Sequence, residues 1–231
     1  MALRRHFWII SVSAVALTAG ACDAGVERRA QAAIERRDNA LAPSVAQPVI
    51  SSHADEMART TQAYEAALKA AGYADALAEE ALTSSEAFAL GPERMAAAKA
   101  AVLKHRALAL TQTDSAILQL KALRAEHPGE AARIDTMLDE LLGMRERRAV
   151  HWGHAESIID ETLGAWRALN TAEGDWALES DGLKFTRLKD REAYDAHAAK
   201  ISAHVTRQQK IMAEQSRSAA KLMQLSQGNG A

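Results

Sequence analysis

The stretch MAAAKAAVLKHRALALTQTDSAILQLKAL, residues 95–123, carries the pattern that decides the fold. Apolar side chains recur in it every seven residues, and a second apolar set lies beside the first. The two sets are Met95, Val102, Ala109, Ala116 and Leu123, with Leu103, Leu110 and Ile117 beside them. This period places them along one face of a helix, which packs against other helices. Because proline suits a first turn, Pro92 predicts a helix over about residues 93–126, ~50 Å long.

A short link, HPGE at residues 127–130, separates this helix from another long one expected over about residues 130–172. Apolar residues again follow one face of the second helix: Ile134, Leu138, Leu141, Trp152, Ala155, Ile159, Trp166 and Leu169. A link this short makes the two helices antiparallel neighbours. Their length predicts an all-α fold, an elongated antiparallel helical bundle rather than a compact globule.

Further helices are expected on both sides of this pair. The segment APSVAQPVISS, residues 42–52, has two prolines and is interpreted as a connection. Ser51 or Ser52 then caps a helix that runs to about Ala71. A second helical segment is expected over residues 73–90, and a last helix over about residues 190–225.

One exception to the helical pattern is WALESDGLKFTR, residues 176–187, which predicts a β-hairpin. An Asp-Gly pair, here Asp181-Gly182, supplies the two positive-φ positions of a type I′ turn. A two-residue loop would pair Ser180 with Leu183, Glu179 with Lys184 and Leu178 with Phe185. An isolated hairpin is marginal in water, so its apolar face must lie on the helices.

The composition fits a folded, alanine-rich helical body. The 231 residues are 48% apolar, 25% charged and 4% aromatic, with a net charge of −2. This charge balance offers no basic field for nucleic acid. No Gly-rich phosphate loop, nucleophile elbow or His-Glu-x-x-His motif occurs in the sequence, which predicts that the protein is not an enzyme and needs no cofactor.

The first 21 residues are typical of an export signal. Arg4 and Arg5 form a cationic start, and the apolar run FWIISVSAVAL, residues 7–17, is too short to remain as a membrane-spanning helix. We therefore expect residues 1–21 to be a signal peptide, residues 22–50 a lipidated segment and linker, and residues 51–231 the bundle domain.

The only cysteine of the chain, Cys22, follows small residues directly after this apolar run. That arrangement resembles a bacterial lipobox, in which the thiol is acylated and becomes the first mature residue. Ala19 departs from the usual Leu or Val, so an ordinary Ala-x-Ala cleavage site with an unmodified Cys22 is the alternative. A lone thiol at the one place that lipidation requires favours the lipoprotein.

A polar interruption, RERRAVHWGH at residues 145–154, is the strongest candidate for chemistry in the bundle. His151 and His154 share a helix face, as do His197 and His204 on the last helix, so four histidines could meet in a metal site. The Glu-x-x-His spacing of di-iron bundles does not occur. The alternatives are an anion or partner patch around the arginines, or a solvated face on which Arg148 pairs with an acid of a neighbouring helix. We therefore predict no metal site.

Residues 181–211, DGLKFTRLKDREAYDAHAAKISAHVTRQQKI, are similar to the C-terminal segment of the YiaF-type lipoproteins, a family of unknown function in Gram-negative bacteria. The shared elements are a Gly-hydrophobic-x-Phe strand, here Gly182, Leu183 and Phe185, and a helix opening with Glu192 and Tyr194. The early cysteine followed by VERRAQAAIERR, residues 26–37, also resembles the start of that family. The resemblance implies an exported, membrane-anchored helical protein.

Together these patterns predict a periplasm-facing protein of the bacterial cell envelope, tied to a membrane through the lipid on Cys22. Its expected role is structural or protein–protein interaction, with an envelope protein as the partner. The alternative is a periplasmic bundle that binds a metal or small ligand near His151 and His154. Asp23 resembles a retention signal for the inner membrane, but the sequence leaves inner and outer membrane open.

Overall fold

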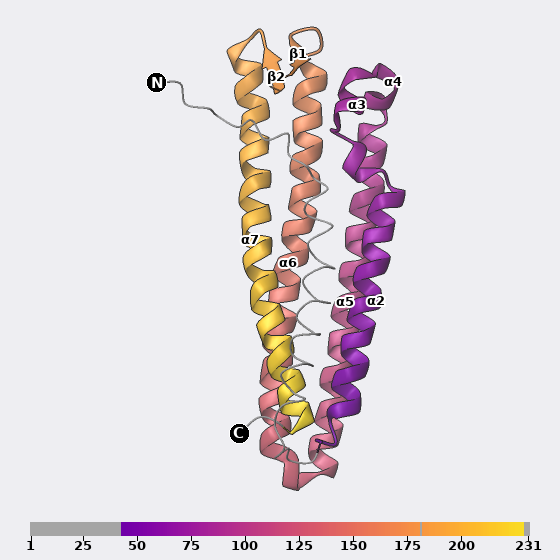
Figure 1. Ribbon diagram of the computed structural model, residues 1–231, viewed down its shortest axis with the longest axis vertical. Coiled ribbons are helices and arrows are strands. Elements are labelled where there is room, and N and C mark those ends of the chain that lie inside the picture. The colour runs from indigo at the N-terminus through magenta and orange to yellow at the C-terminus, as the bar shows by residue number, and fades with distance from the viewer. Residues whose placement is uncertain (1–42, 181, 229–231) are drawn as a thin grey trace.

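The structure, a computed structural model, describes residues 43–180 and 182–228 and has long helices standing side by side (Figure 1). In Figure 1, α2 rises from the lower end, α5 descends, α6 rises and α7 descends. Their bounds are Gln47–Ala70 for α2, Gly91–Glu126 for α5, Ala131–Thr171 for α6 and Leu188–Gln227 for α7. The longest, α6, has 41 residues and is therefore about 60 Å long. The expected all-α antiparallel bundle is confirmed.

The segment between α2 and α5 differs from the single helical stretch expected over residues 73–90. It consists of three short helices: η1 (Tyr73–Asp75), α3 (Glu79–Thr83) and α4 (Ser85–Ala89). Gly72, with a left-handed φ of 63°, ends α2, and extended Ser84 separates α3 from α4. The Ser84 hydroxyl accepts a hydrogen bond from the Ala87 amide, so α4 has its own cap and the helical stretch is broken.

The start of α2 also differs from expectation, because the helix begins at Gln47 and not after Ser51. Pro48 lies in its first turn, where proline removes no helical hydrogen bond. The residues before it belong to the bundle: Ser44 donates from its hydroxyl to Glu130 at 2.5 Å and from its amide to Ser226 at 2.8 Å. The hydroxyl of Ser44 accordingly lowers the pKa of Glu130. The described chain therefore starts at a fixed point on the lower end.

The β-hairpin at the upper end is confirmed, but its pairing is displaced from the expected one. Strand β1 (Trp176–Glu179) pairs with β2 (Gly182–Phe185), with Leu178 opposite Leu183 and Trp176 opposite Phe185. In the expected pairing Leu183 would have faced Ser180. The observed register matches apolar residues with each other on one face, and this matching outweighs the turn preference of Asp-Gly.

Aromatic side chains fasten the hairpin to the helices. The Trp176 indole N–H donates to the Leu169 carbonyl at 2.9 Å, and the Phe185 ring lies 5.7 Å from that of Tyr194. Phe88 of α4 stacks on Trp166 of α6, with ring centroids 5.1 Å apart. The hairpin thus closes the upper end by laying its apolar face on α6 and α7, as an isolated hairpin must.

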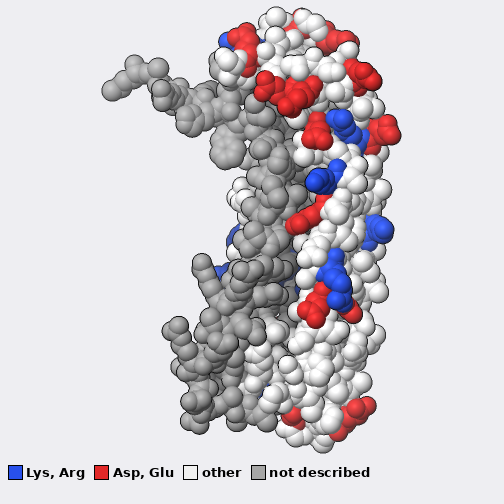
Figure 2. Space-filling view, turned by 45° about the vertical axis from the view of Figure 1, so that its right-hand side comes forward, with Lys and Arg blue, Asp and Glu red and all other residues white. Residues whose placement is uncertain are grey.

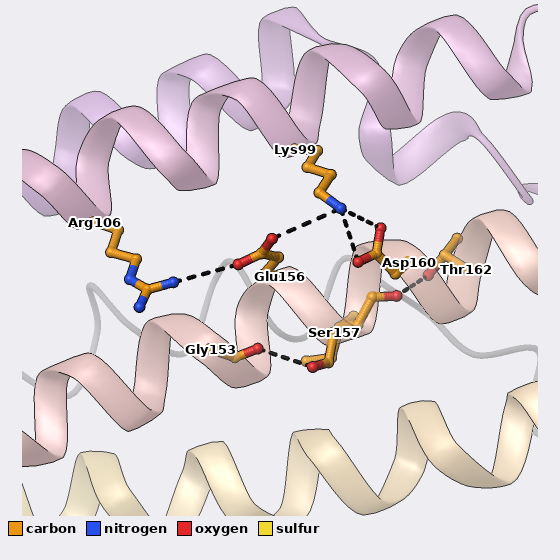
Figure 3. Close-up of polar contacts among 8 residues, drawn as sticks. Lys99, Arg106, Gly153, Glu156, Ser157, Asp160 and Thr162 are labelled. Atoms are coloured by element: carbon orange, nitrogen blue, oxygen red, sulfur yellow. Dashed lines mark hydrogen bonds and ion pairs between the residues drawn. The ribbon is translucent and has the colours of Figure 1, made fainter.

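Ion pairs join α5 to α6 at several levels, and Figure 3 shows those of Lys99 and Arg106 with Glu156 and Asp160. Lys99 Nζ lies 2.8 Å from Asp160 and 3.7 Å from Glu156, which also contacts Arg106 at 3.4 Å. Further down, Asp114 pairs with Arg145, and near the link Arg124 pairs with Asp135. The α5 partners are basic at Lys99 and Arg106, acidic at Asp114 and basic again at Arg124, and each meets the opposite charge on α6 in the observed alignment.

The core consists of two apolar clusters, one above the other. The upper cluster contains Leu68, Tyr73, Ala76, Met95, Ala98, Ala101, Val102, Ala109, Trp152, Ala155 and Ile159. The lower cluster contains Ala46, Ile50, Ala116, Ile117, Leu120, Ile134, Met137, Leu138, Leu141, Met144 and Leu222. Most of the predicted stripe of α5 is buried, but Leu110 and Leu123 are half-buried and Leu103, at its edge, is 45% exposed. Among the residues of α7, only those near its lower end enter a cluster, while Ile201 is buried against the bundle higher up.

Two glycines of α6 provide a matched test of this packing. A Cβ at Gly164 would overlap the ring of His197 on α7, whereas a Cβ at Gly153 would meet no atom within 4 Å. We expect Gly153→Ala to stabilise the protein by about 1 kcal/mol through helix propensity. Gly164→Ala should destabilise it by about 1–2 kcal/mol, because the ring of His197 must move. Urea unfolding of both variants measures the difference, and equal stabilisation by both would contradict the close α6–α7 approach.

Candidate functional site

Cys22, the predicted lipidation site, lies outside the described residues, as does the whole export signal. The predicted residues of the interruption, residues 145–154, and His204 of α7 lie halfway along the bundle, while His197 lies nearer the upper end, beside Glu161. There they form, with groups from every long helix, a polar layer between the upper and lower clusters. We define this polar layer as His53, Thr113, Arg148, His151 and Gln208.

Arg148 is the centre of the polar layer. Its Nη1 atom donates to the Thr113 hydroxyl at 2.6 Å and to His53 Nε2 at 2.9 Å, so one guanidinium links α6 to both α5 and α2. Thr113 is fully buried and His53 is 5% exposed. Because His53 Nε2 accepts this bond, we assign its proton to Nδ1 and the ring is neutral.

The fourth helix joins the layer through Gln208, which is 4% exposed. Its side-chain amide donates to the His151 carbonyl at 3.3 Å. The ring of His151 lies edge-on to Trp152 of the upper cluster, with centroids 5.7 Å apart. A polar group in a core costs stability unless it has a partner, so these bonds let the layer exist between two apolar clusters.

Two histidines of the layer are held neutral. Burial, with a further contribution from Arg148, lowers the pKa of His53 to about 3. Burial, His154 and Arg148 lower the pKa of His151 to about 4. At neutral pH both rings are therefore uncharged, and the positive charge of the layer belongs to Arg148.

The neighbouring arginines of the interruption connect α6 to other helices. Arg145 pairs with Asp114 of α5, through a second contact of 3.1 Å from Nη2. Arg147 donates to the Ser218 hydroxyl of α7 at 2.6 Å. The expected ion pair with a neighbouring helix is thus made by Arg145, while Arg148 contacts His53 and Thr113. These arginines bond within the bundle, which argues against an open patch for an external anion.

The four histidines proposed as a metal site do not meet at one point. His154 and His204 face each other, with their Nδ1 atoms 2.9 Å apart. His197 instead contacts Glu161 at 2.6 Å, and Lys200 contacts the same carboxylate at 3.3 Å. In the described part of the chain, no three His, Cys, Asp or Glu side chains lie close enough together to hold a metal ion.

Several residues of the site were missed by the sequence analysis. Thr113 occupies a stripe position, four residues after Ala109 and seven before Leu120, where a polar residue signals a bond inside the core. His53 and Gln208 fall within amphipathic helices, and their partners are far away in sequence. Pattern alone could have found Thr113, but the three-helix contact of Arg148 requires the packed structure.

The two ends of the bundle also differ in the charge of their surfaces. In Figure 2 acidic side chains gather at the upper end, over the region of α3 and α4, while uncharged residues dominate the lower part of this face. Within residues 43–180 and 182–228, no helix has the length and apolar character needed to cross a membrane. Comparisons of the chain with protein-family models, curated proteins and solved structures find no match.

The lowered pKa values of His53 and His151 predict acid sensitivity. In the unfolded chain both rings take up a proton below about pH 6.5, whereas in the folded chain they stay neutral until about pH 3 and 4. The unfolded state therefore binds more protons, and stability falls as the pH drops below about 6.5. Each histidine contributes up to about 1.4 kcal/mol per pH unit. Urea unfolding between pH 7.5 and 5 measures this slope.

The variant His53→Gln tests the assignment. Glutamine keeps an acceptor towards Arg148 but cannot take up a proton, so its unfolding free energy should vary less steeply with pH. The measurement stops at pH 5 because carboxylates with lowered pKa values, such as Glu130 and Glu140, also make the unfolding free energy fall with pH in more acidic solution. An unchanged slope in His53→Gln would contradict a neutral, buried His53.

Proposed function

We propose that this protein is an exported, lipid-anchored helical module of the bacterial cell envelope, with a structural or protein-interaction role. The observation that carries the proposal is the fixed exit of the chain at the lower end of the bundle. Ser44 is bonded there to both Glu130 and Ser226. The described chain therefore begins at one end of the rod, and the hairpin and acidic side chains lie at the other.

The dimensions support a role in which the module extends from a membrane. The bundle is about 60 Å long, as long as the 41-residue α6. The 20 residues between Cys22 and Pro43 can span at most roughly 70 Å. An anchor at Cys22 would let the hairpin end meet a partner at a distance from the lipid surface, and the acidic side chains there favour a partner with a basic surface.

The resemblance of residues 181–211 to the YiaF-type lipoproteins remains a prediction, and it points to the same compartment. Gly182, Leu183 and Phe185 form β2 and Tyr194 packs on Phe185, so the resembling residues make one local unit at the hairpin end. The proposed role uses the surface of the bundle and assigns no reaction to the protein.

The variant Cys22→Ser tests the anchor. Without the thiol no acyl group can be added, so we expect the protein to move from the membrane fraction to the soluble periplasmic fraction of a Gram-negative host. Intact-mass measurement of the wild-type protein should show a chain that begins at Cys22 and carries acyl groups.

The variant Ala19→Leu is the matched control. It restores the usual lipobox residue and should leave the protein acylated and in the membrane fraction. If Cys22→Ser stayed in the membrane fraction, or if the mature wild-type chain carried an unmodified cysteine, the lipid anchor would be wrong. If Cys22→Ser still bound an interaction partner, the role of the bundle surface would not depend on the anchor.

A further inference from the structure

One pair of ring nitrogens in the middle of the bundle is arranged as a ligand pair. His154 on α6 and His204 on α7 approach with their Nδ1 atoms 2.9 Å apart and their ring centroids 5.1 Å apart. These two values mean that the nitrogens face each other across the seam between the helices. A contact between two imidazole nitrogens requires a proton on one Nδ1 and a lone pair on the other.

The ring of His154 is suited to act as a ligand at neutral pH. Burial lowers the pKa of His154, and His204 and Arg207 lower it further. Both side chains are only half-buried, so an ion from solvent can reach them. If the ring that carries its proton on Nδ1 moves it to Nε2, both Nδ1 lone pairs become available and no net proton is released.

The spacing selects the geometry of the ion. With metal–nitrogen bonds of about 2.0–2.1 Å, two ligands at a right angle are separated by about 2.9 Å, and two tetrahedral ligands by about 3.4 Å. The observed separation of 2.9 Å is that of a hydrogen-bonded pair and lies close to the right-angle value, and imidazole nitrogens suit Cu²⁺ and Ni²⁺. Because the lone pairs now point at each other, both rings must tilt to direct them at one ion.

We propose that His154 and His204 form a two-histidine site for a divalent transition-metal cation of the Ni²⁺ or Cu²⁺ kind, with water completing the coordination. The ion takes the place of the shared proton and joins α6 to α7. This inference does not depend on the proposed anchor or interaction role. It retains two of the four histidines considered from the sequence and excludes His197, which is bonded to Glu161.

A bound ion would strengthen a weakly buried part of the fold. The buried residues of α7 are Ile201, Gln208, Leu222 and Ser226, and none of them belongs to the upper cluster. The ion would cross-link α7 to α6 one turn above Gln208. Since it binds the folded state and has no preformed site in the unfolded chain, it raises stability.

A positive charge near the site, that of Arg207, opposes binding of the ion. Arg207 lies close enough to affect the pKa of His154, and its positive charge repels a divalent cation. Burial lowers the pKa of His151 as well, so that ring adds no charge at neutral pH. Removal of the Arg207 charge should therefore tighten metal binding without touching either ligand.

The test is titration of the full chain, carrying Cys22→Ser to remove the thiol as a competing ligand, with Ni²⁺ at pH 7.5 by isothermal calorimetry. We expect one equivalent to bind and the urea midpoint to rise with Ni²⁺ concentration. His154→Ala and His204→Ala should each weaken binding at least tenfold, and Arg207→Gln should strengthen it severalfold. His197→Ala is the matched control on the same face of α7 and should bind as the parent does.

Circular dichroism without metal establishes that each variant is folded, and Asn replaces Ala at either histidine if the alanine variant is not. The proposal is overturned if the parent binds no Ni²⁺, or if both histidine variants keep the parent affinity. Equal binding by Arg207→Gln and the parent would place the ion away from His154 and overturn it as well.

Discussion

The contact of Arg148 with His53 and Thr113 is the constraint that gives this bundle a single arrangement. Its two core clusters are rich in alanine and in aliphatic residues that recur every seven positions, so apolar packing alone allows a helix to slide by one repeat. A slide of seven residues along α5 would replace Thr113 opposite Arg148 by Arg106 or Leu120. Either exchange places a charge or a hydrocarbon where the half-buried guanidinium now has a hydrogen-bond acceptor, which disfavours the shifted arrangement.

The surface enforces the same register independently. Lys99–Asp160, Asp114–Arg145 and Arg124–Asp135 lie at equal distances in sequence on either side of the Gly129–Glu130 link. Exposed ion pairs contribute little stability one by one, but all of these pairs form together only in the observed alignment. At the other end the β-hairpin sets the start of α7 relative to the end of α6. Buried polar bonds, surface charges and a hairpin therefore specify one alignment at three levels.

The sequence predicted the long helices because a heptad pattern is a local property of one chain segment. It predicted α5 and α6 almost to the residue, and it identified residues 145–154 as the polar interruption. It was wrong over residues 73–90, where the Ser84 cap breaks a stretch of good helix formers. It was also wrong about the pairing of Leu178 and Phe185, because apolar matching across the hairpin outweighed the local turn preference.

The candidate site could be predicted only in part, since its chemistry depends on contacts between distant segments. The interruption supplied Arg148, His151 and His154, but the partners His53, Thr113 and His204 lie on three other helices. Because His197 and His204 are seven residues apart on one helix face, the sequence analysis treated them as equal candidates for a metal ligand. The structure separates them, because the carboxylate of Glu161 takes His197 and leaves His204 to face His154.

The different partners of His197 and His204 divide α7 into parts with more and with fewer contacts to the other helices. Near its ends α7 is tied by the His197–Glu161 pair and by the bond from Arg133 to the Leu225 carbonyl, both at 2.6 Å. Between Ile201 and Leu222 the buried residue is Gln208, and the nearest cross-helix contact above it is the histidine pair. A single proton or ion between His154 and His204 therefore acts on a stretch of α7, residues 202–221, that has no fully buried apolar side chain.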